Sequence, residues 1–291
     1  MEYVAEAERS FPWREGPFLV SRVAADKDLR SAIDKAVGLV GGFSKFIEPG
    51  DTVTIKPNLN TADPYPASSD PLFIKALGEA ILEAGAAKLK IMDSSTIRTS
   101  TRKVAEKIGL TPVAEELGAE LFFLDEHPWV GQRFPRAEYM TSGDIGEPVL
   151  SCGKLVLAPC LKTHRLARFT GAMKLLIGLL KRSHRVRKMH LRKLQAKIAD
   201  LASYFHPALV VMDAREVFVT GGPTNGQREA PGVILASDDM VAIDVEGVKI
   251  LQGYEAKNKL KQPVWKMPQF RHAVKLRLGA RSDDDIHLVE P

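Results

Sequence analysis

The chain of 291 residues contains 45% apolar and 26% charged residues, which is typical of a globular protein and argues against a fibrous or low-complexity class. Its net charge of +5 is compatible with anionic small molecules, nucleic acid or a membrane surface, and selects none of them. The two cysteines, Cys152 and Cys160, form no CxxC pair, which excludes an iron–sulfur cluster or an all-cysteine zinc site held by this chain alone.

The sequence also bears on where the protein resides. The acidic N-terminus lacks the apolar core of a signal peptide, and the longest apolar run, at 172–180, is too short to cross a bilayer. A chain with so few cysteines is typical of a reducing compartment. We therefore expect a cytoplasmic protein with no membrane span.

Strand and helix patterns alternate along the chain. Residues 1–16 are predicted to form an N-terminal tail, and residues 17–291 a single α/β domain. Strands are predicted at 18–24, 51–58, 87–93, 119–125, 153–161, 208–214, 231–237 and 286–290. Helices are predicted at 29–43, 69–86 (with Ser69 as N-cap), 101–109, 112–118, 168–181, 187–204 and 239–253. This alternation predicts an α/β fold, Rossmann-like, with a mainly parallel sheet and helices on both faces, built as one unit or as two lobes.

Polar residues follow the predicted strands. In open parallel sheets, ligands bind past the carboxyl ends of the strands. The residues at these ends are Lys56, Asn58, Asp93, Ser94, Lys162, Thr163, His164, Asp213 and Asp238. Loops are polar in any protein, which accounts for part of this set. We expect the set to contribute to a ligand site.

Lys174 lies inside an apolar run. In a helix over 168–181, Lys174 would share one side with Thr170, Gly171 and Gly178, a shallow face bearing one amine. Burial there would lower the lysine's pKa and make its amine a nucleophile or a base. The alternative is that Lys174 extends along the apolar surface into water.

The stretch 181–193 is strongly basic and includes His190. It is either a solvated helix face or a surface for phosphates or an acidic partner. Since no aromatic residue lies within it to stack on bases, nucleic acid is the least favoured partner.

A glycine-rich loop at 220–227 contains Gly222 and Gly226. Such a loop can present backbone N–H groups to an anion, although a simple turn explains it equally well. It lacks the spacing of a P-loop or a dinucleotide fingerprint.

From about residue 17 to the end, the chain resembles the domain of unknown function 362 family. The matching stretches are 55-IKPNL-59, 69-SDP-71, 84-AGA-86, 161-LKTHRLARFTGAMKLLIG-178, Asp213, 221-GGPTNG-226 and 235-LASDDMVAIDVEG-247. The chain departs from the family at Leu175, where asparagine is common. Members are often linked to ferredoxin-like iron–sulfur modules, so the resemblance implies an iron–sulfur partner for any electron-transfer role.

Part of the chain is also similar to the catalytic domain of nickel-pincer lactate racemases. That resemblance implies a covalent cofactor on Lys174, a metal ligand at His190 and a proton-transfer base at His164. The racemases have a further acid/base histidine after the second strand, where this chain has Asp93, Ser94 and two more hydroxyl residues.

Two hypotheses follow. In the first, an isomerase- or racemase-like acid–base enzyme binds a small carboxylate or hydroxy-acid-like anion through Lys56, Lys162 and Lys174, while His164 moves a proton. Asp93 and Asp213 would orient the cations, and His190 would hold an optional divalent metal, nickel, iron or zinc. In the second, a redox accessory protein docks an iron–sulfur partner through 181–193.

Overall fold

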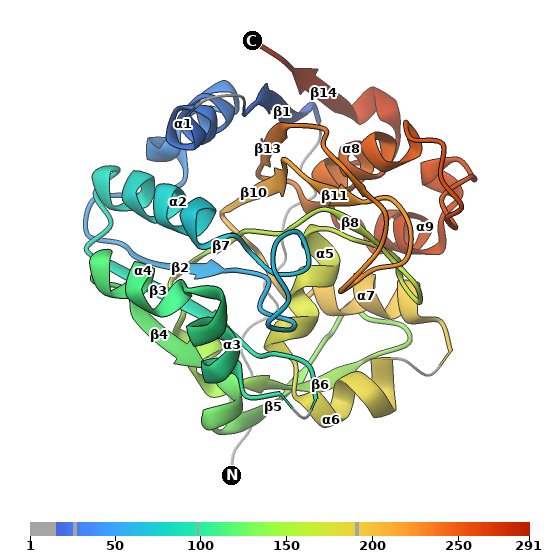
Figure 1. Cartoon of the computed structure of the whole chain (residues 1–291). Coiled ribbons are helices and arrows are strands. Elements are labelled where there is room, and N and C mark those ends of the chain that lie inside the picture. The colour runs from blue at the N-terminus through green and yellow to red at the C-terminus, as the bar shows by residue number, and fades with distance from the viewer. Residues whose placement is uncertain (1–15, 26–27, 98, 190–191) are drawn as a thin grey trace.

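The computed structural model describes residues 16–25, 28–97, 99–189 and 192–291. The predicted tail therefore lies almost entirely outside the described residues. Figure 1 shows a central sheet with helices packed on each side.

The main sheet has eight strands in the order β14-β1-β13-β10-β7-β2-β3-β4. Their bounds are Ile286–Val289 for β14, Phe18–Ala24 for β1, Val233–Ser237 for β13, Leu209–Ala214 for β10, Lys154–Leu157 for β7, Thr52–Lys56 for β2, Lys88–Asp93 for β3 and Glu120–Phe123 for β4. Strand β13 runs antiparallel to its neighbours β1 and β10, and the other pairings are parallel. The prediction of a mainly parallel α/β sheet is confirmed.

Helices cover both faces of this sheet, as predicted. One face carries α1 (Leu29–Leu39), α2 (Pro71–Glu83), α3 (Thr101–Ile108) and α4 (Leu110–Glu116). The other carries α5 (Ala172–Leu175), α7 (Leu194–Ala202), α8 (Met240–Gln252) and α9 (Pro268–Lys275). Successive strand side chains point to opposite faces, so Leu155 and Leu157 join one apolar core while Val156 joins the other.

The start of α2 differs from the prediction. Asp70, not Ser69, is the N-cap, and its side chain accepts from Leu72 N at 2.9 Å. The Ser69 hydroxyl instead accepts from Asn58 N at 2.8 Å. Ser69 therefore fixes the loop that follows β2, where the candidate site lies.

Three two-stranded ribbons accompany the main sheet. They pair β5 (Trp129–Arg133) with β6 (Ser142–Gly146), β8 (Lys162–His164) with β9 (Arg168–Thr170), and β11 (Val217–Phe218) with β12 (Arg228–Glu229). The prediction of one helix over 168–181 was wrong at its start, because 168–170 pairs back onto 162–164 as a strand.

The basic stretch is also not one helix. It contains α6 (Arg182–His184), then a π-helical turn at Arg185–Met189, and α7 begins only at Leu194. Within the described part of the chain, no helix has both the length and the apolar character needed to cross a bilayer.

Candidate functional site

A cavity of about 300 Å³ opens at the carboxyl ends of β2 and β3, against α5 and the π-helical turn. Many of the predicted site residues border it: Lys56, Asn58, Asp93, Ser94, Lys162, His164, Thr170 and Lys174. Parallel strands deliver their carboxyl ends to one edge of a sheet, which brings Lys56 and Asp93 together. Lys162, His164 and Thr170 come from the β8–β9 ribbon and Lys174 from α5.

A buried ion pair forms one wall of the cavity. Lys56 Nζ lies 2.7 Å from Asp93 Oδ1 and donates to Pro57 O at 2.6 Å. Asp93 also accepts from the backbone N–H groups of Leu59 and Ser94. Burial lowers the pKa of Lys56, and the Asp93 charge opposes that shift. Asp93 therefore holds the Lys56 ammonium in place.

Gly178 leaves the room that this pair needs. A Cβ at position 178 would overlap Asp93 Oδ1 and lie 2.7 Å from Lys56 Nζ. The glycine predicted to make a shallow face thus lets the backbone pass directly over the ion pair.

Lys162 is fully buried without a carboxylate partner among the described residues. Its Nζ donates to the carbonyls of Pro66 and Ala67, each at 2.8 Å. Burial lowers its pKa to about 8. The charge of Asp213 opposes this shift from beyond ion-pair distance, and the two carbonyls hold the amine in place.

Lys174 projects from α5 and borders the same cavity, half-buried. Within the described chain its amine has no hydrogen-bond or ion-pair partner. Burial lowers its pKa to about 7, and the positive charges of Lys162, Lys56 and Arg185 push it in the same direction. The side chain is therefore partly shielded from water and borders the cavity.

Two arginines complete the cationic wall, and sequence reasoning missed both. Arg185 is buried and donates to the carbonyls of Leu180, Ser94, Ser95 and Gly178 and to the Ser94 hydroxyl. Burial lowers the pKa of Arg185 to about 10. These bonds turn its guanidinium inward, so Arg185 is not part of the exposed basic surface of 181–193.

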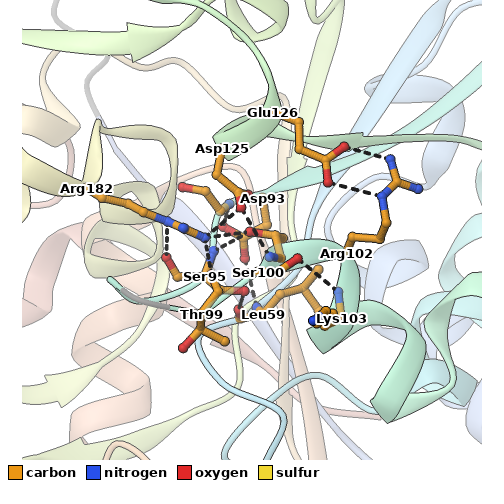
Figure 2. Close-up of polar contacts among 12 residues, drawn as sticks. Leu59, Asp93, Ser95, Thr99, Ser100, Arg102, Lys103, Asp125, Glu126 and Arg182 are labelled. Atoms are coloured by element: carbon orange, nitrogen blue, oxygen red, sulfur yellow. Dashed lines mark hydrogen bonds and ion pairs between the residues drawn. The ribbon is translucent and has the colours of Figure 1, made fainter.

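Arg182 lies one turn earlier. Its guanidinium reaches between Ser95, Thr99 and Asp125, as Figure 2 shows, and lies 3.0 Å from Asp125 Oδ2. Arg182 and Arg185 are three residues apart and so face the same way on a helical turn. That spacing was the signal in the sequence that could have revealed them.

The charges of the cation cluster (Lys56, Lys162, Lys174, Arg182 and Arg185) do not balance. Lys56 is paired with Asp93, and Arg182 with Asp125. Among the described residues, the other three members have no carboxylate within ion-pair distance. The cavity wall therefore carries excess positive charge in a partly desolvated place, which favours a bound anion.

His164 has a defined tautomer in this site. Its Nδ1 accepts from the backbone N–H groups of Leu166 and Ala167, at 3.2 and 3.1 Å. A proton on Nδ1 would break both bonds, so the neutral ring carries its proton on Nε2. In this tautomer His164 can donate a hydrogen bond from Nε2, and the role of a base expected from the sequence stays a prediction.

Helix α5 starts later than predicted because a side chain from α8 caps it. Asp244 accepts from Ala172 N at 2.5 Å and from Met173 N at 3.1 Å, and burial raises its pKa to about 7. Gly171 precedes the helix, where a Cβ would overlap Asp244 Oδ1, so its role here is close packing.

Thr170 occupies β9 opposite Lys162 rather than a helix face. Its hydroxyl is buried and has no hydrogen-bond partner among the described residues, and the side chain borders the cavity. An unpaired buried hydroxyl can donate to or accept from a ligand.

Other predicted residues lie away from the cavity. Asp213, fully buried at the end of β10, pairs with Arg215 at 2.7 Å and accepts from Tyr65 Oη at 2.7 Å. It therefore orients Arg215. Asp238 lies at the opposite edge of the sheet, because β13 is antiparallel, and pairs with Lys45 at 3.2 Å.

The glycine-rich loop packs against the β8–β9 ribbon. A Cβ on Gly222 would overlap the carbonyl of Thr163, and one on Gly226 the carbonyl of Thr220. Thr163 is buried, with its hydroxyl unpaired among the described residues. Pro223 is the residue of this loop that borders the cavity.

The predicted metal ligand, His190, lies outside the described residues. Within the residues that are described, no three His, Cys, Asp or Glu side chains gather in a way that would hold a metal ion. The described donor set does not fit a metal centre, and metal binding stays a prediction.

Comparison with known proteins finds a matching family, a related protein and a solved structure that aligns in part. The model of the family called domain of unknown function (DUF362) matches residues 53–249. The thylakoid-associated protein sll1697 of Synechocystis sp. is 25% identical over 226 residues, which cover 73% of this chain and 67% of that protein.

A solved structure from Thermotoga maritima aligns with a TM-score of 0.46 at 11% identity, covering 78% of this chain and 57% of that one. This chain thus spans less than two thirds of that solved protein. The family match includes the strands, the ribbon and the helix that carry the cation cluster, as well as Gly178. Because it extends over more than half of the sequence, the chain belongs to the domain of unknown function 362 family.

Proposed function

We propose that this protein binds a small carboxylate or hydroxy-acid-like anion in the cavity, and that Lys174 exchanges a proton with it. One observation carries the proposal: Lys162, Lys174 and Arg185 border one cavity with no carboxylate within ion-pair distance among the described residues. A buried cation without a counter-charge is costly, and a bound anion would supply that charge.

The proposed chemistry depends on the protonation states of Lys174 and His164. With a pKa of about 7, Lys174 is a neutral amine in a large share of molecules at neutral pH and can accept a proton. His164, with its proton on Nε2, would donate to an oxygen on which negative charge develops. Together they fit proton abstraction next to a carboxylate, a step that isomerases and racemases share.

A second candidate is the docking of an iron–sulfur partner. It is favoured by the exposure of Arg187, Lys188, Arg192 and Lys193 beside the cavity. Attraction between such a patch and an acidic protein would weaken as salt increases. The double charge reversal R187E/K188E would abolish such binding and leave anion binding in the cavity intact.

Calorimetric titration at pH 6.5 tests the proposal, with lactate, pyruvate and inorganic phosphate as ligands. We expect Lys174→Met to weaken binding by about tenfold or more, since a hydrogen bond to a charged group contributes about 1.5–3 kcal/mol. The matched control is Lys261→Met, at an exposed loop position. Equal affinity in wild type and Lys174→Met, with the fold intact by circular dichroism, would overturn the proposal.

The proposed proton transfer is measured separately from binding. In D₂O, exchange of the hydrogen next to the carboxylate of a bound hydroxy acid should be visible by NMR and be lost in Lys174→Met. Binding without any exchange would leave a binding protein and refute the proton-transfer role.

A further inference from the structure

Large apolar side chains border the opening of the cavity. Ile97, Leu166 and Val186 line it, yet they are 48%, 62% and 48% exposed. They come from three separate places: the loop after β3, the β8–β9 turn and the π-helical turn. We call these three residues the apolar rim.

The clustering of these residues is unusual. Six large apolar side chains are strongly exposed in the described residues, and three of them form the rim. Exposed apolar residues scattered singly need no explanation, but a group at a pocket entrance marks a place where apolar surface is covered on binding.

The rim continues inward as an apolar wall. Leu175, Ile177 and Leu194 also line the cavity, whereas Lys56, at the end of β2, and Lys162, at the start of β8, are each only 1% exposed. The cavity is therefore charged at the sheet and apolar toward solvent. A compact, fully hydrated anion would contact only the charged part of the cavity and leave the apolar rim exposed.

We propose that the ligand is an amphiphilic anion, with an acidic head on the cation cluster and a hydrocarbon tail against the apolar rim. This inference rests on the proposed anion site and specifies its ligand class. The volume of about 300 Å³ is at the lower end of ligand pockets, so a head and a short tail fill it and a longer tail reaches the rim.

The affinities of straight-chain carboxylates test the inference. Acetate, butyrate, hexanoate and octanoate are titrated at pH 6.5. Hexylammonium, which has a similar tail but a positively charged head, is the control. Each methylene buried against the rim should tighten binding by about fourfold. Hexylammonium should not bind, because the head would meet excess positive charge.

One triple and one double variant locate the effect of chain length on the molecule. I97S/L166S/V186S should flatten the dependence on chain length and leave acetate binding unchanged. L72S/L150S, which alters exposed apolar residues elsewhere, should leave the dependence as in wild type. Thermal denaturation verifies that both variants fold.

The outcomes separate this inference from the anion site. If acetate binds and Lys174→Met weakens it but longer chains gain nothing, the inference is overturned and the anion site stands. If chain length matters equally in I97S/L166S/V186S, the rim is not the tail site. If no carboxylate or phosphate binds, the anion site itself is refuted.

Discussion

Lys56 and Asp93 form a buried ion pair that joins the carboxyl ends of adjacent strands, with 2.7 Å between Nζ and Oδ1 and side-chain exposures of 1% and 3%. The pair neutralises one cation at the base of the cavity. Lys162, Lys174 and Arg185, which lack such a partner within the described chain, then provide the positive charge offered to a ligand.

Asp93→Asn tests the contribution of this pair to stability. The change leaves a buried ammonium without its counter-charge, and such losses cost about 3–5 kcal/mol. We expect a decrease of this size in the free energy of unfolding, measured by urea denaturation. The double variant K56M/D93N removes both charges and should be clearly more stable than Asp93→Asn.

The control is Asp284→Asn, at an exposed position, which should change stability by less than about 0.5 kcal/mol. If Asp93→Asn were as mild as this control, Lys56 would not depend on Asp93 in the folded protein.

Gly178→Ala tests the close approach of backbone to the same pair. The added methyl would overlap Asp93 Oδ1, so the pair must shift, and overpacking of this kind costs about 1–3 kcal/mol. We expect weaker anion binding together with lower stability.

Gly38→Ala is the matched control. Gly38 is exposed within α1 and a Cβ there meets nothing within 4 Å. Alanine at a helix interior should stabilise by about 0.5–1 kcal/mol. A Gly178→Ala protein that gained stability in the same way would contradict the packing argument.

The sequence predicted the strands and many of the residues that border the cavity, because both depend on local patterns. Lys56 and Asp93 end apolar runs, and parallel strands align such ends. The direction of β13 could not be predicted, since an apolar strand reads alike in both directions, and Asp238 was therefore expected at the wrong edge. The inward turn of Arg185 depends on carbonyls from Ser94 and Ser95, about 90 residues away.

Anion affinity should fall as the pH rises. The pKa values are about 7 for Lys174 and about 8 for Lys162, both below the ordinary value for lysine, so both amines are charged at pH 6 and neutral by pH 9.5. Each lost charge weakens the attraction for an anion. Calorimetric titrations from pH 6 to 9.5 should show a decline of up to about tenfold per pH unit for each amine that titrates.

In Lys174→Met, the part of the decline near pH 7 should disappear. An affinity that stayed constant up to pH 9.5 in the wild-type protein would mean that neither amine contacts the ligand as a cation.

Stability should vary with pH in the opposite sense. Between pH 7 and 10.5 the unfolded chain keeps the Lys174 proton and the folded chain does not, so the free energy of unfolding of the wild-type protein rises with pH relative to Lys174→Met. The relative slope is at most about 1.4 kcal/mol per pH unit. Urea denaturation of both proteins at several pH values measures it.

His164 offers a test that separates its structural bond from its chemical role. Its Nδ1 accepts from the N–H groups of Leu166 and Ala167, and an asparagine side chain can place its Oδ1 near that position. We expect His164→Asn to keep the turn and most of the stability, whereas His164→Ala loses about 0.5–1.5 kcal/mol by removing bonds to partly exposed amides. Both variants lack a donor at Nε2, so both should lose anion affinity and proton exchange.

Nitrogen-15 NMR of the wild-type imidazole should show the proton on Nε2. A proton on Nδ1, or full activity in His164→Asn, would rule out the donor role.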